Sequence, residues 1–263
     1  MRKRGLTFAD IGVLLLVVGV LAVFVFVPLH PRYRKASLKR VACANNLYQM
    51  GMVLKLYATE NNGRFPFIDA TKNNFSFEAS AIFPEYLTDH MIVACPASPN
   101  WDAKTNSRLR ANVFHPDSAV GAVHPDCFVD MGYCYLGWVV TSDEEADVFL
   151  AAYDRLSPEK YDNDVVVAEG RGNGGGNVIH RIQSDSARVL NDVSKSNHDI
   201  PVIWDNPRQI NHEQIGGNVL YLDGHVEFIA YPGKFPMTET MARLLEERPR
   251  APILDYDLPV PQP

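Results

Sequence analysis

The strongest constraint in this sequence is a run of 19 uncharged residues, from Ile11 to Leu29. At about 1.5 Å rise per residue, a helix of that length matches the ~30 Å hydrocarbon layer of a bilayer. The run is longer than the ~7 to 15 apolar residues of a secretory signal peptide, and it leads into Pro31 rather than into small residues suited to cleavage. We therefore predict a retained membrane span over residues 11–29.

Charge restricts the partners of the rest of the chain. Cations flank both ends of the apolar run, so the positive-inside rule does not orient it. Beyond residue 40 the chain has 17 cations against 30 acids, which follows from the totals of 25 and 31 after removal of the eight cations and one acid before that point. Because nucleic-acid binding needs clustered cations, we expect no nucleic-acid partner.

A second helical pattern follows the apolar run. Between Ala36 and Asn62 there is no proline, and apolar residues recur at steps of four, three, four and three. The members of this stripe are Cys43, Leu47, Met50, Leu54 and Tyr57. Asn61-Asn62-Gly63 supplies a stop signal. The pattern predicts one long helix over residues 6–62, bent at Pro28 or Pro31, whose second half packs on a partner surface.

The remainder has the pattern of an α+β head over residues 63–232. Short β-branched and aromatic segments indicate strands at 89–93, 131–141, 164–168, 177–182, 200–204 and 218–230. Asp223-Gly224 interrupts the last of them and predicts a β-hairpin. Ser142 begins a predicted helix over 142–155. A short helix is predicted over 239–247 within a proline-rich tail, residues 233–263, and the glycine-rich stretch 169–177 is predicted to be a loop.

The chain has four cysteines, Cys43, Cys95, Cys127 and Cys134. They show no zinc-ribbon spacing, so a structural zinc site is not indicated. All four are candidates for disulfides, and Cys127 with Cys134 would close a short loop. Buried free thiols remain the equal alternative, because pairing cannot be deduced from the sequence.

The order of these parts resembles the prepilin-like proteins, which are the type IV pilins and the type II secretion pseudopilins. The matching stretches are RKRG at residues 2–5, CANNLYQMGMVLKLYATENNGRFP at 43–66 and NHEQIGGNVLYLDGHVEF at 211–228. The last of these is similar to a C-terminal motif of histidine, a spacer of about nine residues, and aspartate-glycine. Leu6 and Asp10 stand where the family usually has phenylalanine and glutamate.

The resemblance implies how the N-terminus is processed. Residues 1–5 would be a leader that a prepilin peptidase removes after Gly5, leaving Leu6 as a methylated N-terminus. Asp10 would then be the fifth mature residue and would pair with the N-terminal amine of a neighbouring subunit during assembly. The implied partners are the inner membrane, the peptidase and like subunits. The implied location is the bacterial inner membrane, single-pass, with a cytoplasmic N-terminus and a periplasmic or extracellular head.

One polar set near the C-terminal end has the residue types of a metal site: His212, Asp223, His225 and Glu227. The last three alternate and would share one face of a strand, with ligand types that suit zinc or calcium. Hairpin faces alternate in this way without any ligand, and we therefore predict no metal and no cofactor. No GxSxG or HExxH motif is present, so no enzyme activity is predicted.

Together these features predict an α+β, pilin-like protein with a long N-terminal helix packed on an antiparallel sheet. The predicted function is that of a non-enzymatic, membrane-anchored subunit of a type II secretion or type IV pilus-like assembly. The alternative is a permanently anchored extracytoplasmic binding protein that forms no filament. A metal-dependent enzyme using the His212 set is the weaker third hypothesis.

Overall fold

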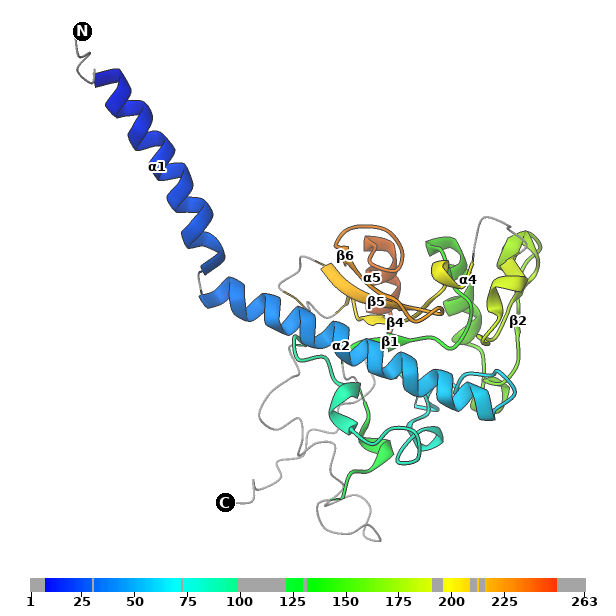
Figure 1. The fold of residues 1–263 in the computed structure, drawn as a ribbon. Coiled ribbons are helices and arrows are strands. Elements are labelled where there is room, and N and C mark those ends of the chain that lie inside the picture. Colours follow the sequence, from blue (N-terminus) through cyan, green and yellow to red (C-terminus); the bar gives the residue numbers. More distant parts are fainter. Residues whose placement is uncertain are drawn as a thin grey trace. The chain divides into compact units, whose positions relative to one another are not determined.

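The computed structural model describes residues 8–29, 31–71, 73–98, 122–129, 132–190, 196–208, 212 and 216–249. The chain divides into two compact units, Met1–Lys39 and Arg40–Pro263. Figure 1 shows the helices and strands of both units along the sequence.

The N-terminal region contains two helices, α1 (Phe8–Leu29) and α2 (Pro31–Glu60). Proline is favoured in the first turn of a helix but disfavours helical backbone in the residue before it, so a helix boundary falls at Pro31. The single helix predicted over residues 6–62 is therefore wrong. The predicted stop at the other end is confirmed, because Asn62 and Gly63 have positive φ angles and the Gly63 N–H donates to the carbonyl oxygen of Ala58.

No helix in the described part of the chain is long and apolar enough to cross a membrane. This finding contradicts the predicted span over 11–29. It also contradicts the predicted single-pass location in the inner membrane.

The second unit is α+β and contains two antiparallel sheets. The larger has the strand order β1 (Tyr133–Tyr135), β4 (Pro201–Asp205), β5 (Gly216–Tyr221) and β6 (Val226–Ala230). The smaller pairs β2 (Val165–Val166) with β3 (Val178–Ile179). The predicted hairpin is confirmed as β5 and β6, with Asp223-Gly224 in the turn.

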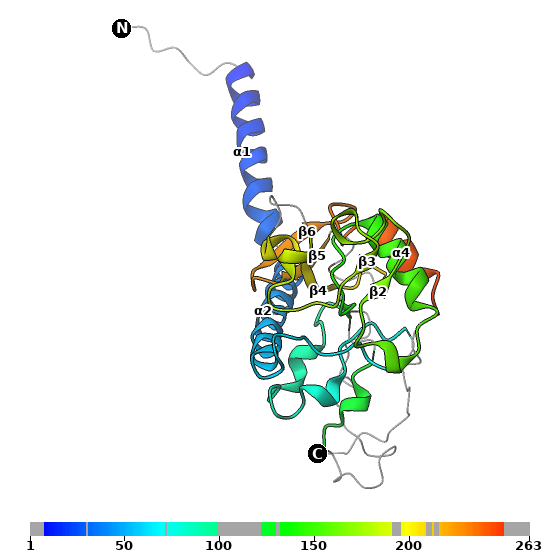
Figure 2. The same ribbon diagram turned by 90° about the vertical axis from the view of Figure 1, so that its right-hand side faces the viewer.

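Side chains of the larger sheet alternate between two faces, and each face has its own apolar core. Tyr133, Ile203 and Leu220 pack with the buried stripe of α2. Cys134, Trp204 and Val219 pack instead with α4 (Asp143–Tyr153) and α5 (Glu239–Glu246). Figures 1 and 2 show α2 along one side of the sheet and α4 and α5 along the other. The head is therefore layered as helix, sheet and helices.

The amphipathic stripe of α2 faces the sheet as predicted. Cys43, Leu47, Met50 and Leu54 are buried, whereas Tyr57 is half-buried and the stripe ends on Ala58. On the same face, a Cβ atom at Gly51 would lie 3.0 Å from Cδ1 of Leu220 in β5. The absence of a side chain at Gly51 thus lets α2 approach the sheet closely.

The predicted helix over 142–155 is confirmed as α4, and its cap explains where it begins. The Ser142 hydroxyl accepts a hydrogen bond from the Glu145 N–H. The strand predicted at 89–93 is wrong, because the Asp89 side chain caps a 3₁₀ turn, η2 (His90–Val93), by accepting from the Met91 N–H. The other 3₁₀ turns are η1 (Ala79–Ala81), η3 (Pro125–Cys127), η4 (Pro158–Lys160), η5 (Asn173–Gly175), η6 (Ser186–Leu190) and η7 (Asn197–Asp199).

Candidate functional site

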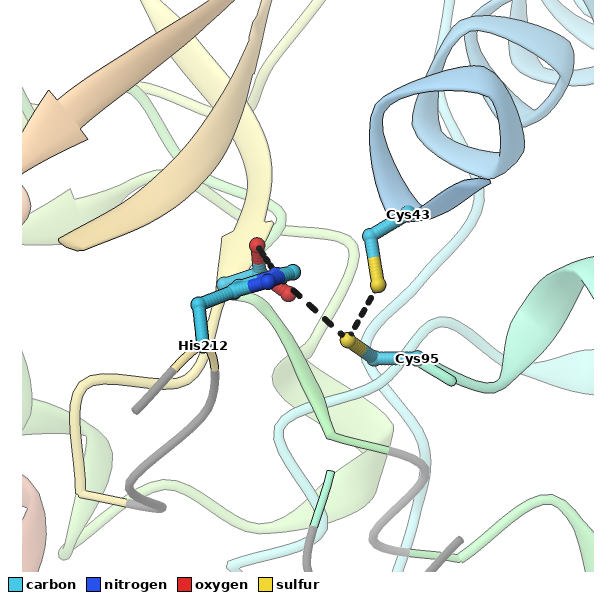
Figure 3. A group of neighbouring side chains, drawn as sticks. Cys43, Cys95 and His212 are labelled. Atoms are coloured by element: carbon cyan, nitrogen blue, oxygen red, sulfur yellow. Dashed lines mark hydrogen bonds and ion pairs between the residues drawn. The ribbon is translucent and has the colours of Figure 1, made fainter. Parts of the chain in front are cut away.

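Four titratable side chains meet where α2 crosses the end of β4. They are Cys43, Cys95, Asp205 and His212, all of them buried, with side-chain atoms within 4.8 Å of one another. In Figure 3 the side chains of Cys43, Cys95 and His212 converge from three separate segments. This is the densest group of buried reactive side chains among the described residues, and we treat it as the candidate site.

Each member is placed by a different local feature. Cys43 belongs to the buried stripe of α2, and Cys95 follows η2. Asp205 is the last residue of β4 and is fully buried. His212 has a φ of 53°, a left-handed conformation that is uncommon outside glycine and costs some conformational energy. The tertiary fold, and not proximity in sequence, therefore assembles the cluster.

A hydrogen-bond network fixes the carboxylate of Asp205. Its Oδ2 atom accepts from His212 Nε2 at 2.9 Å, from the Asn218 backbone N–H at 2.7 Å and from Asn218 Nδ2 at 3.0 Å. Three donors on one oxygen satisfy a buried negative charge that would otherwise be costly. The other ring nitrogen of His212, Nδ1, is buried and has no hydrogen-bond partner among the described residues.

The two sulfur atoms of the cluster are in direct contact. Cys43 Sγ lies 2.6 Å from Cys95 Sγ, and Cys95 Sγ lies 3.9 Å from His212 Nε2. The same two segments are also joined one turn along α2, where Asn46 Nδ2 donates to the carbonyl oxygen of Ala94 at 3.2 Å. A hydrogen bond outside the two cysteines therefore also keeps their segments adjacent.

The environment separates the acidities of the two thiols. The contact with Cys95 lowers the pKa of Cys43 to about 6, with help from His212 and against the effect of burial. Burial raises the pKa of Cys95 well above its usual range, and the neighbouring Cys43 adds to the effect. Burial alone would lower the pKa of His212, but its hydrogen bonds to Asp205 and Cys43 outweigh burial and raise the pKa to about 9. Cys43 is thus the nucleophilic thiol of the pair.

The cluster contains zinc-type ligands but not a zinc-type arrangement. Two thiolates on one tetrahedral zinc lie about 3.8 Å apart, since each Zn–S bond is about 2.3 Å. The sulfurs here are only 2.6 Å apart, and the His212 nitrogen that faces them already donates to Asp205. To bind here, a metal ion would have to move the two sulfurs apart and break the hydrogen bond between His212 and Asp205.

The residues predicted as one polar set lie in three environments. His212 belongs to the buried cluster, whereas the other three residues are exposed or half-buried. Asp223 accepts from His225 Nδ1 at 2.6 Å and pairs with His198 Nδ1 at 3.2 Å, and these rings stack on the hairpin surface. Glu227 pairs with Lys234 at 2.6 Å. Of the four predicted residues, the structure therefore brings together Asp223 and His225, which lie in the turn before β6, but not His212 or Glu227.

The remaining predicted site residues are dispersed. Cys134 is buried on the other face of the sheet from Cys43 and Cys95, and Cys127 is half-buried in η3. Among the described residues all four thiols are free. Gly5 and Leu6 lie outside the described residues, and Asp10 lies near the start of α1 in a position whose side chain is not described.

Sequence reasoning missed Asp205 and His198. The signal for Asp205 was available, because an acid directly follows the apolar segment Ile200 to Trp204 at the end of a predicted strand. An acid in that position is either an exposed turn residue or the anchor of a buried network, and the sequence does not separate these cases.

Comparison with known proteins identifies no relative: no protein family, no curated protein and no solved structure matches this chain.

Proposed function

We propose that the protein is a non-enzymatic, prepilin-like subunit of a type II secretion or type IV pilus-like assembly. The observation that carries the proposal is the apolar surface of α1. Nearly every described side chain between residues 11 and 23 is exposed and apolar. The large ones are Ile11, Val13, Leu14, Leu15, Leu16, Val17, Val18, Val20, Leu21 and Val23. A helix that is apolar on all sides needs apolar partners on several sides to shield it from water.

The occupant that we propose for this surface is α1 from like subunits. Several copies of one apolar helix can surround one another and bury all faces, which a single flat partner cannot do. This proposal agrees with the resemblance to prepilin-like proteins at the N-terminal end of the chain. A prepilin peptidase would remove residues 1–5, and Asp10 would then pair with the N-terminal amine of Leu6 of a neighbouring subunit. Pairing opposite charges at a buried helix contact offsets the cost of burying each one.

A second apolar surface supports assembly through the helices. On the face of α2 away from the sheet, Val41, Tyr48, Met52 and Leu56 are 51–61% exposed. Their spacing of seven, four and four residues places them on one side of the helix. Side chains on this stripe lie outside the core of the head, so the stripe is free to contact a neighbouring subunit.

Substitution in α1 tests this proposal. Leu15→Asp in the full chain places a charge in the proposed helix contact, and we expect the assembled fraction in sedimentation to fall at least tenfold, because burying an unpaired charge costs several times the ~1.4 kcal/mol of a tenfold change. The matched control is Val166→Asp, which replaces another exposed apolar residue on the head and should leave assembly unchanged.

The outcome of this pair decides between the two hypotheses. Equal assembly of Leu15→Asp and the unsubstituted chain would contradict a role for α1 in the contact. A chain that stays monomeric without any substitution would favour the alternative, a binding protein that forms no filament.

A further inference from the structure

We propose that Cys43 and Cys95 form a disulfide that fastens α2 to the segment after η2, with the positive charge of His212 favouring the Cys43 thiolate. The inference is independent of the proposed function, because it concerns how the head is closed and not what the head assembles with. It also selects one pairing from the four candidate cysteines.

The geometry favours this pairing over the others. Cys43 and Cys95 are the cysteines whose sulfur atoms touch, at 2.6 Å, and the Asn46 to Ala94 hydrogen bond keeps their segments adjacent. A disulfide bond is about 2.05 Å long, so the sulfurs need to approach by roughly 0.6 Å. A shared zinc ion would require them to separate by about twice as much. Cys134 cannot join either of them, because it packs on the opposite face of the sheet.

The surroundings suit the chemistry of bond formation. With a small disulfide such as oxidised glutathione as oxidant, the Cys43 thiolate attacks one of its sulfurs, and one glutathione leaves as a thiolate. The Cys95 thiol then gives its proton to the glutathione thiolate released in the first step and attacks the Cys43 sulfur of the mixed disulfide. The second glutathione leaves as a thiolate and takes up a proton from the solvent, which replaces the one that Cys43 lost on ionisation. The net change oxidises two protein thiols to one disulfide and reduces one glutathione disulfide to two thiols.

Asp205 acts here as a positioning residue. Its hydrogen bond to Nε2 of His212 orients the imidazole and stabilises the positive charge of the ring. The bond that forms would connect two segments 52 residues apart, and closing a loop of that length restricts the unfolded chain considerably. The disulfide would thereby hold α2 on the sheet.

Thiol counting on the full chain tests the proposal. The protein is refolded from denaturant with oxidised glutathione, so that the buried sulfurs are accessible, and free thiols are counted after a second denaturation. We expect the four thiols to fall to two, and a peptide map without reductant should link the peptides of Cys43 and Cys95. Reductant should lower the midpoint of thermal unfolding by roughly 10 °C.

Three variants and a metal assay make the result unambiguous. Cys127→Ser removes the half-buried thiol and should leave the linked peptide unchanged, whereas Cys43→Ser should abolish it. His212→Gln removes the charge that favours the Cys43 thiolate, so it should slow formation of the bond severalfold while giving the same product at long times. Four remaining thiols, a Cys127 to Cys134 link, or one zinc per chain with both thiols reduced would each overturn the proposal.

Discussion

Replacing Asp205 by alanine is expected to lower the free energy of unfolding of the head by about 3–5 kcal/mol, because the substitution leaves a buried donor set without its acceptor. His212 Nε2, the Asn218 N–H and Asn218 Nδ2 all donate to one oxygen of this carboxylate. Urea unfolding followed by the fluorescence of the buried Trp138 and Trp204 would measure the change.

An exposed aspartate provides the matched control. Asp162 pairs with Arg64 across a solvent-exposed contact of 3.1 Å, and such pairs contribute at most about 1 kcal/mol. Asp162→Ala should therefore change the unfolding midpoint in urea only slightly. If Asp205→Ala were as mild as Asp162→Ala, the buried network would not be a source of stability, and the account of the cluster would be wrong.

Leu47→Ala is expected to cost about 2–5 kcal/mol of unfolding free energy. Leu47 is fully buried in the stripe of α2 that packs on the sheet, and its removal leaves a cavity between the two layers. The same urea titration measures the effect, and the slope of the transition should stay unchanged if the head still unfolds as one unit.

Leu56 allows the same substitution on the same helix without a cavity. Its side chain is 52% exposed, and alanine is at least as good a helix former as leucine, so Leu56→Ala should stay within about 0.5 kcal/mol. Equal losses from both substitutions would indicate that α2 is not docked on the sheet by the face described above.

Local patterns predicted the parts of the head that local interactions determine. The stripe of α2, the Ser142 cap of α4 and the hairpin around Asp223-Gly224 follow from residues close together in sequence. The segment 89–93 was misread because a short apolar run suits a strand as well as a turn, and the Asp89 cap decided the case. The sequence predicts one helix bent at Pro28 or Pro31, whereas the structure has two helices.

The candidate site could not be predicted from local patterns, because its residues come from distant parts of the sequence. Cys43, Cys95, Asp205 and His212 come from four segments, and only the packing of α2 against β4 brings them together. Alternation along one strand instead grouped Asp223, His225 and Glu227, of which Asp223 and His225 pair in the turn whereas Glu227 pairs with Lys234. Periodicity identifies which side chains share a face, but not which distant segment that face will meet.

The N-terminus of the mature chain tests the central claim most directly. If the protein is a prepilin-like subunit, the full chain produced together with a prepilin peptidase should lose residues 1–5, and intact-mass spectrometry should find a chain that begins at Leu6. A Gly5→Val variant, whose cleavage position is blocked, should keep all five residues. An unsubstituted chain that retains Met1 to Gly5, or loses only Met1, in the presence of active peptidase would contradict the proposed function.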